Sequence, residues 1–153
     1  MVVASVGNNG GDGSSDKSIR YPAKYSEVIA VGATTQTDTR WNTSGVLGSA
    51  IGSELDVMAP AEDSSIRTTD ITGSSGYTTG DYNYYFGQTS AAAPHVSGLA
   101  CLIRSKYPSM DYSEVKEQII LSAKDLGATG HDIYYGYGRI DAGKALQYIF
   151  VPD

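Results

Sequence analysis

Cysteine and long apolar runs are both scarce in this sequence. The single cysteine, Cys101, cannot form an intrachain disulfide, so cysteine usage does not indicate the redox compartment. Cys101 lies inside an apolar segment, where a small buried core residue is a better interpretation than a reactive nucleophile. No apolar run approaches the about 20 residues that span a membrane, and the segment from Met1 to Ala4 lacks the basic and hydrophobic regions of a secretion signal.

Positive charge is scarce as well. The 153 residues include 11 lysines and arginines against 17 aspartates and glutamates, which gives a formal net charge of -6. A surface that binds nucleic acid needs a basic patch, so this balance argues against a nucleic-acid partner. The length corresponds to one domain, and the sequence contains no internal repeat and no linker.

Short apolar runs and helix signals alternate along the chain, as in an α/β protein. Residues 2–6 and 28–31 are predicted to be buried strands, and a glycine follows each of them. Residues 62–86 are rich in Ser, Thr, Gly and Tyr and are predicted to form an irregular hairpin or loop. Its tyrosines form either a binding surface or ordinary packing contacts.

A glycine-rich segment then leads into a long apolar run, which predicts a buried helix from about Ser90 to Lys106. Thr89 is the expected N-cap, and Pro94 is placed in the first turn, where its missing N–H costs little. Ser90 therefore lies at the start of the helix, where unpaired backbone N–H groups and the positive dipole end favour a developing negative charge. A serine hydroxyl there can attack a carbonyl while its own N–H helps to hold the oxyanion.

Two further helices are predicted near the C-terminus. The first begins at a capping box formed by Asp111 and Glu114 and ends at residues 126–127. The second begins at Asp141 and carries three apolar residues, Ala145, Leu146 and Ile149.

Asn8 follows the first predicted strand, at the carboxyl end where α/β sheets place their ligands. Beside a glycine, an asparagine is most often a turn residue. Its side-chain amide can also donate a hydrogen bond to an oxyanion without carrying charge. The local pattern by itself leaves both interpretations open.

The segment from Gln88 to His95 resembles the serine motif of the subtilisin-like serine peptidases (subtilases). Gln88 stands where the family usually has glycine, a departure that concerns the backbone angle before the serine. The resemblance implies an α/β, three-layer subtilisin-like fold with a mainly parallel sheet, of which residues 1–153 form the C-terminal part of a single catalytic domain. The matching motif residues are Thr89, Ser90, Ala92, Pro94 and His95, and four more segments match in the family's order: 2–10, 21–33, 55–60 and 135–142.

The resemblance implies a serine endopeptidase that acts on peptides or proteins. Ser90 would be the nucleophile and Asn8 the oxyanion donor. A cation at Arg20 would favour acidic or polar substrate side chains, whereas the alternative is an ordinary exposed arginine. The implied substrate-binding residues are Ser5, Val6, Gly7 and Arg20.

No cofactor is implied as a requirement. Subtilases often hold a weakly bound structural cation, calcium or sodium, at backbone carbonyls that correspond to the region of Ala23, Tyr25 and Val28. No metal site is expected from side chains, because the glycine-rich loop at residues 9–18 fits no calcium-binding template.

The sequence lacks a base for Ser90. His95 lies on the same helix about 140° around its axis, and the resemblance implies a buried structural role for it. His131 is expected to be a surface histidine rather than half of a catalytic pair with Asp132, because adjacent loop residues seldom orient each other. The family's catalytic Asp and His precede the matched segments, so we expect the 153 residues alone to have no meaningful peptidase turnover.

Two classes of function therefore remain. The first is an endopeptidase completed by the N-terminal half of the same domain or by self-association, since the predicted strands would otherwise present an open edge and an uncovered face. The second is a non-catalytic half-domain that acts as an interaction or structural module. A lipase-type hydrolase is disfavoured because the residues around Ser90 do not read Gly-x-Ser-x-Gly. Family members are mostly exported and some are intracellular, so secretion is favoured while the compartment stays undetermined.

Overall fold

Three parallel strands form the central sheet of residues 1–147, which the computed structural model describes. Their spatial order is β1 (Val2–Ser5), β2 (Val28–Thr34) and β3 (Val57–Pro60). All seven residues of β2 are buried. A central strand that is covered on both faces explains this nearly continuous apolar sequence.

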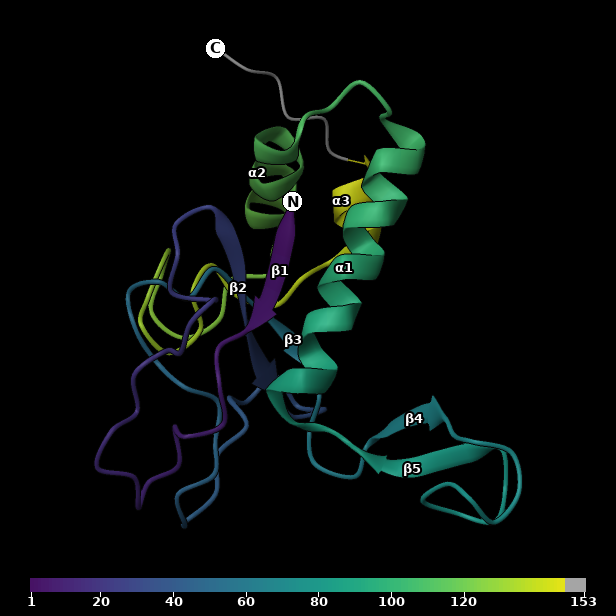
Figure 1. The fold of residues 1–153 in the computed structure, drawn as a ribbon. Coiled ribbons are helices and arrows are strands. Elements are labelled where there is room, and N and C mark those ends of the chain that lie inside the picture. The colour runs from purple at the N-terminus through teal and green to yellow at the C-terminus, as the bar shows by residue number, and fades with distance from the viewer. Residues whose placement is uncertain (148–153) are drawn as a thin grey trace.

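The helices of the described residues lie on one face of this sheet (Figure 1). Helix α1 (Gln88–Lys106) packs against all three strands. Helices α2 (Tyr112–Ser122) and α3 (Ala142–Gln147) pack against α1 and against each other. The strands run toward the end of the sheet at which α1 begins, so the start of α1 lies beside their carboxyl ends (Figure 1).

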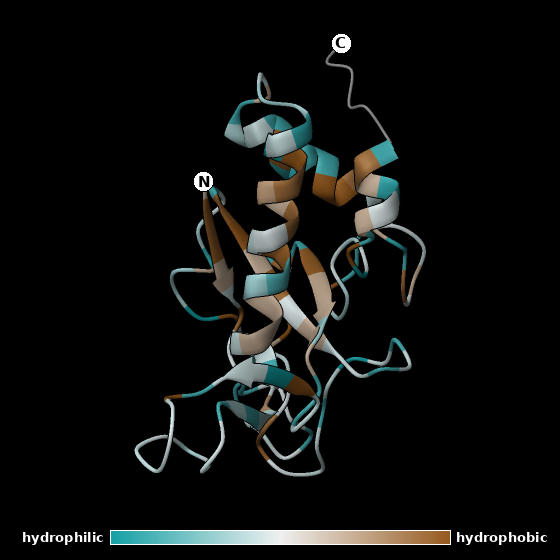
Figure 2. Cartoon of the chain, turned by 90° about the vertical axis from the view of Figure 1, so that its right-hand side faces the viewer, coloured by the Kyte–Doolittle hydropathy of each residue, from teal (hydrophilic) through white to brown (hydrophobic). Residues whose placement is uncertain are grey.

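Two apolar clusters form the core, one on each face of the sheet. Ile29 and Val31 of β2 pack beneath the helices with Val96 and Ile103 of α1. Ala30 points to the opposite face, where loops rather than helices complete the cluster. Figure 2 shows the hydrophobic residues concentrated in the strands and helices, with hydrophilic loops around them. The loop residues that cover the second face include Ile19, Ala23, Ala50 and Leu55.

The two edges of the sheet differ. The segment at 138–140 borders β3, because Met58 N–H donates to the Gly138 carbonyl at 2.9 Å and Ile140 N–H donates to the Met58 carbonyl at 3.0 Å. No strand lies beyond β1 among residues 1–147, and Val2 is 53% exposed. The expected open edge is therefore present at β1. The expected uncovered face of the sheet is wrong, because α1 and the loops cover both faces.

An antiparallel hairpin of β4 (Ile66–Thr69) and β5 (Tyr82–Phe86) projects away from the sheet (Figure 1), as predicted for residues 62–86. The Arg67 guanidinium lies 4.0 Å from the centre of the Tyr82 ring, a cation–π contact. The tyrosines singled out in the sequence are all exposed: Tyr77, Tyr82, Tyr84 and Tyr85.

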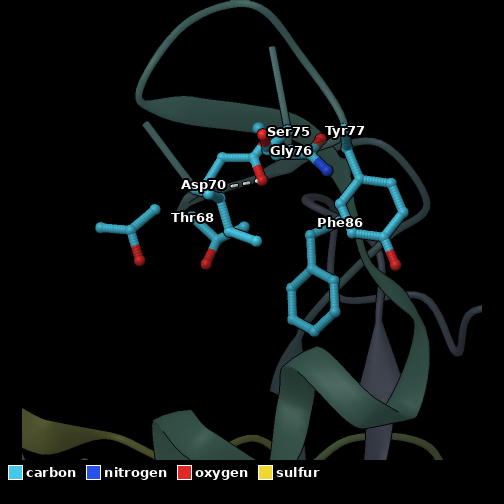
Figure 3. A pocket seen from close by; sticks show the side chains of 9 residues that line it. Thr68, Asp70, Ser75, Gly76, Tyr77 and Phe86 are labelled. Atoms are coloured by element: carbon cyan, nitrogen blue, oxygen red, sulfur yellow. Dashed lines mark hydrogen bonds between the residues drawn. The ribbon is translucent and has the colours of Figure 1, made fainter. Parts of the chain in front are cut away.

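An open pocket of about 780 Å³ lies between this hairpin and the loop at 70–77 (Figure 3). Phe86 and Tyr77 line one part of it, and Thr68 and Asp70 line another. Asp70 shapes the loop, because its carboxylate accepts hydrogen bonds from the backbone N–H groups of Ile71 at 2.8 Å and Thr78 at 2.9 Å. The pocket ends at Phe86, before the segment that carries Ser90.

Several element boundaries differ from the sequence prediction. Strand β1 ends at Ser5 rather than at residue 6, and β3 spans Val57–Pro60 rather than the 55–59 that the family resemblance implied. Helix α1 begins at Gln88 with Gly87 as its N-cap, so Thr89 lies inside the first turn and is not the cap. Helix α2 ends at Ser122, and Gly127 adopts its positive φ of 78° in a later turn rather than at the helix end. Strand β2 continues through Gly32, because its pairing with β3 extends to Thr34. Each boundary is set by contacts with distant segments.

The starts of α2 and α3 agree with the prediction. The Asp111 carboxylate accepts from the backbone N–H groups of Ser113 and Glu114, and the Glu114 carboxylate accepts from the Asp111 N–H. Asp141 accepts a hydrogen bond from the Lys144 N–H at 2.9 Å. Ile149, predicted in the last helix, lies outside the described residues. Within residues 1–147, no helix combines the length and hydrophobicity needed to cross a membrane.

Candidate active site

Asn8 lies just beyond β1, at the carboxyl edge of the sheet. Gly7 before it has a φ of 106°, a backbone region that favours glycine, and a Cβ there would lie 2.9 Å from Asn9 Oδ1. The carbonyls of Gly7 and Asn8 accept hydrogen bonds from the N–H groups of Ala50 at 3.0 Å and Gly48 at 3.1 Å. The backbone of Asn8 is therefore held by a neighbouring loop.

Strand β5 leads into α1 through Gly87. A Cβ on Gly87 would lie 2.6 Å from the Glu62 carbonyl oxygen and 2.7 Å from Asp63 Cα, so only glycine fits there. The N–H of Gln88 donates to the Ala61 carbonyl at 2.7 Å. Gln88 has a φ of 67°, which a residue with a side chain rarely adopts. The backbone before Ser90 is thus fixed in an unusual conformation at the position where the family usually has glycine.

The Asn8 side chain joins the end of the strand to the start of the helix. Its Oδ1 accepts hydrogen bonds from the Thr89 N–H at 3.1 Å and from the Thr89 hydroxyl at 2.6 Å. Its Nδ2 donates to Gln88 Oε1 at 3.0 Å. Because a backbone N–H can only donate, Oδ1 must be the atom that faces Thr89. The structure therefore brings Asn8 to the residue immediately before Ser90.

Ser90 is exposed in the first turn of α1. Backbone N–H groups in a first turn have no partner within the helix, and the dipole there is positive. Pro94 lies beyond the first turn, contrary to the prediction, because the helix begins at Gln88 rather than at Ser90. An accessible hydroxyl thus lies at a helix start beside an uncharged amide, an arrangement suited to stabilising a negatively charged oxygen.

Both histidines are bonded elsewhere. His95 Nδ1 lies 2.8 Å from the Ala91 carbonyl oxygen, and the side chain is exposed rather than buried as expected. His131 Nε2 lies 2.9 Å from the Leu55 carbonyl oxygen, while Asp132 Oδ1 accepts from the N–H of Tyr134 at 2.7 Å. His131 is exposed, as predicted, and does not pair with Asp132 in the structure.

Cys101 is also exposed, so its expected place in the core is wrong. Like His95, it lies on the side of α1 that faces away from the sheet. Segments at Phe86 and Ile140 border His95 only across open pockets, and no element of residues 1–147 buries either side chain.

The predicted substrate-binding residues lie along the chain next to Asn8. Ser5 pairs with Val31 at the end of β1. Val6 is fully buried, with its N–H bonded to the Val31 carbonyl and its own carbonyl accepting from the Arg20 N–H, both at 3.0 Å. The Arg20 guanidinium is exposed and lies 3.0 Å from the Asp16 carboxylate. The charge of Arg20 is therefore paired locally.

Two of the three carbonyls expected to hold a cation, those of Tyr25 and Val28, already have partners. Lys116 Nζ donates to the carbonyls of Ser26 at 3.1 Å and Val28 at 3.0 Å, and lies 3.0 Å from the Asp56 carboxylate. The Tyr25 carbonyl accepts from the Val28 N–H at 3.0 Å. These oxygens fit a metal ion poorly, because an ammonium group already lies among them. Residues 1–147 contain no cluster of three or more His, Cys, Asp or Glu side chains that could hold a metal.

A partly buried arginine supports the loop that follows Asn8. Arg40 Nη1 donates to the carbonyl oxygens of Ser49 at 2.6 Å and Gly10 at 3.2 Å. Burial lowers the pKa of the Arg40 guanidinium from its ordinary value, although arginine stays charged at neutral pH. This charge fixes two loop carbonyls close to the strand end that carries Asn8.

Sequence reasoning missed three contacts. It singled out Gln88 for its backbone, and the structure adds a side-chain bond to Asn8. It assigned Thr89 to capping, whereas Thr89 donates twice to Asn8. The only sequence signal that set Gln88 apart was the presence of glutamine where the family usually has glycine. Nothing in the sequence pattern pointed to Lys116.

Comparison with known proteins agrees with this geometry. A profile described as the subtilase family matches residues 1–138. Subtilisin DY from Bacillus licheniformis is 42% identical over 149 residues, which cover 96% of this chain and 47% of that protein. A thermostable alkaline protease from Halalkalibacterium halodurans is 34% identical over 147 residues, covering 96% of this chain and 34% of that protein.

Solved structures show the same fold. Fervidolysin from Fervidobacterium pennivorans, a keratinolytic enzyme related to subtilisin, superposes with a TM-score of 0.75 at 28% identity. The match covers 97% of this chain and 22% of that structure. The chain thus spans half or less of the length of these relatives.

Proposed function

Because this chain belongs to the subtilase family, we propose that residues 1–153 supply the nucleophile and the oxyanion donor of a serine endopeptidase. They would form the C-terminal part of one catalytic domain, whose general base and orienting carboxylate lie outside these residues. The observation that carries the proposal is the pair of hydrogen bonds from Thr89 to Asn8 Oδ1, at 3.1 and 2.6 Å. These bonds hold an amide donor beside the helix start that carries Ser90.

The chemistry then follows from the positions of the two groups. An external base takes the proton of the Ser90 hydroxyl, and the oxygen attacks the carbonyl carbon of a peptide bond. The resulting oxyanion accepts hydrogen bonds from Asn8 Nδ2 and the Ser90 N–H. The base returns the proton to the leaving amine as the C–N bond breaks. Water, activated by the same base, then releases the acyl group and restores Ser90.

The proposed substrates are peptides or proteins. We assign Ser5, Val6 and Gly7 to substrate binding because they lead directly to Asn8 along the chain. We assign Arg20 to the same substrate-binding region because its backbone N–H donates to the Val6 carbonyl. The ion pair with Asp16 weakens the attraction of Arg20 for acidic substrate side chains. We therefore expect Arg20 to contribute only weakly to substrate selection by charge.

The proposed partner is the N-terminal part of the same catalytic domain, in the same polypeptide or as a second chain. The relatives are considerably longer than this chain, which spans 47% of subtilisin DY. The outer edge of β1 is unpaired among the described residues, and one apolar side of α1 is left exposed. This side, the outer stripe of α1, consists of Pro94, His95, Gly98, Cys101 and Leu102.

No bound cofactor is required in this proposal. We propose that the Lys116 ammonium supplies the positive charge for which the family's weak cation was expected, since it already binds the Val28 carbonyl. On family grounds we also propose that the protein is exported, which detection in the culture medium rather than in cells would support.

Complementation tests the function. The chain is mixed with an N-terminal subtilase fragment that carries the family's Asp and His, and hydrolysis of a fluorogenic peptide is measured. We expect no hydrolysis by either piece alone, hydrolysis by the mixture, and loss of hydrolysis with Ser90→Ala. Ser97→Ala is the matched control, because Ser97 is an exposed serine on the same helix, bonded only to the Ala93 carbonyl.

Two outcomes would contradict the proposal. Hydrolysis by the chain alone that disappears with Ser90→Ala would mean that the base lies within residues 1–153. A mixture that forms a stable complex without hydrolysis would favour the non-catalytic interaction module.

A further inference from the structure

The amide that would hold the oxyanion already has an acceptor in this chain. Asn8 Nδ2 donates to Gln88 Oε1 at 3.0 Å. We propose that Gln88 is an internal competitor for the oxyanion donor: its side-chain carbonyl takes the Asn8 amide proton in the resting protein and must leave when substrate reacts. This inference rests on the proposed function, because it concerns the same donor.

The orientation of both amides supports this assignment. The Thr89 N–H and hydroxyl lie on the Oδ1 side of Asn8, so Nδ2 is the end that faces Gln88. A donor must meet an acceptor, and Gln88 therefore presents its Oε1. In this orientation Gln88 meets Asn8 as an acceptor and not as a second donor.

Gln88 is not needed to orient Asn8. Two hydrogen bonds from Thr89 already fix the Asn8 side chain, and the loop fixes its backbone through Gly48. The main chain of Gln88 is held separately by its bond to Ala61. Removing the Gln88 side chain therefore leaves the donor in place and removes only the acceptor that competes with the substrate oxygen.

The expected effect is modest and has a definite sign. A neutral hydrogen bond of ordinary strength corresponds to roughly a threefold to tenfold change in rate when it must be broken in the reaction. Gln88→Met keeps a long side chain without an acceptor and should raise kcat/KM by this factor, and Gln88→Gly should do the same. Gln88→Glu should lower it, because a carboxylate accepts more strongly and repels the oxyanion.

The test uses the chain complemented with the N-terminal subtilase fragment. Each Gln88 variant is made with Asn8 and with Asn8→Ala, and both peptide hydrolysis and the affinity of a peptide aldehyde that adds to Ser90 are measured. We expect Gln88→Met to increase both by threefold to tenfold with Asn8 present and to change neither with Asn8→Ala. A decrease, no change, or an increase that persists with Asn8→Ala would overturn the proposal.

A second measurement does not depend on activity. In two-dimensional ¹H–¹⁵N spectra of the full chain alone, the Asn8 side-chain amide is identified by its loss in Asn8→Ala. Gln88→Met should move one of its proton signals upfield, as expected when a hydrogen bond is lost, while the Thr89 backbone signal stays in place. An unchanged Asn8 signal would overturn the Gln88 proposal. Failure of complementation with the shift observed would instead contradict the proposed function alone.

Discussion

At the scale of single residues, the positions at the start of α1 tolerate few substitutions. Gly87 packs so closely against the backbone of Glu62 and Asp63 that any side chain would overlap it. The next residue, Gln88, is held at a positive φ by hydrogen bonds on both sides. The position of Ser90 therefore depends on a glycine that carries no chemistry of its own.

We expect Gly87→Ala to destabilise the chain. The new Cβ would lie 2.6 Å from a backbone oxygen, which cannot move aside as a flexible side chain would. Overpacking of this kind typically lowers the free energy of unfolding by about 1–3 kcal/mol. Urea unfolding followed by circular dichroism measures the change.

Gly98→Ala is the matched control for this prediction. Gly98 also lies in α1, but a Cβ there has no heavy atom within 4 Å. Alanine should therefore stabilise the isolated chain by about 0.5–1 kcal/mol, the usual difference from glycine inside a helix. Equal stability of Gly87→Ala and the wild type would contradict the packing seen at the helix start.

At the scale of elements, Lys116 fastens α2 to the end of the sheet. Its ammonium binds two backbone carbonyls before β2 and at its start, together with the Asp56 carboxylate before β3. Asp56 also accepts a hydrogen bond from the Ala30 N–H at 2.8 Å. The Lys116 side chain thus joins a helix to the start of β2 and to the segments that precede β2 and β3.

We expect Lys116→Met to lower the free energy of unfolding by about 1–3 kcal/mol, because hydrogen bonds to a charged group are lost and Asp56 keeps an unpaired charge. Added sodium, potassium or calcium should partly restore the melting temperature of Lys116→Met and leave the wild type unchanged. Lys17→Met is the control, since the only ion pair of Lys17 within residues 1–147 is a 4.0 Å contact with Asp12. Equal stabilisation of the wild type by calcium would contradict the proposed role of Lys116.

A second link between elements depends on Asp38. Its carboxylate accepts hydrogen bonds from Lys124 after α2, at 2.8 Å, and from Arg139 beside β3, at 2.6 Å. The bond from Lys124 and then that from Arg139 lower the pKa of the Asp38 carboxyl below its ordinary value, against the opposing effect of burial. This contact ties the loop after β2 to the C-terminal part of the chain.

The sign of the pH dependence follows from this lowered pKa. The contribution of Asp38 to the free energy of unfolding is complete above the ordinary aspartate pKa of about 3.9. It is lost as the pH falls from there through the lowered pKa that Asp38 has in the folded protein. We therefore expect Asp38→Asn to reduce the melting temperature at pH 7 and to flatten its decline below pH ~4. Melting curves from pH 7 to pH 2 test this, with the exposed Asp63→Asn as control. Parallel declines for Asp38→Asn and the wild type would contradict the link.

At the scale of the whole molecule, the outer stripe of α1 is the feature that needs a partner. The opposite side of the helix packs on all three strands, so that side of α1 is already part of the hydrophobic core. A second layer placed on the stripe would bury the exposed side of the helix. This arrangement is the physical basis for expecting the N-terminal part of the domain at this surface.

Cys101 reports on this docking directly. We expect its thiol to react readily with a maleimide in the isolated chain and at least about tenfold more slowly after the N-terminal fragment is added, since a buried thiol is poorly accessible. Cys101→Ser provides the background. Unchanged reactivity in a mixture that has gained peptidase activity would place the partner on another surface.

The sequence by itself determined the features that depend on near neighbours. The Asp111–Glu114 capping box, the cap at Asp141 and the first two strands appear where the local pattern predicted them, and the third strand lies where the family resemblance implied it, with small differences in length. The matched family segments also gave the fold and the family. These features depend on hydrogen bonds within one turn and on apolar periodicity, which a chain carries wherever its other parts lie.

Only the tertiary structure decided which groups meet at the start of α1. Asn8 and its partners Gln88 and Thr89 are 80 and 81 residues apart, and Lys116 reaches a carbonyl 88 residues away. Such contacts depend on how the sheet and helices pack, which no local pattern encodes. The same holds for the exposure of His95 and Cys101: an apolar helix is buried on a given side only where another element covers it.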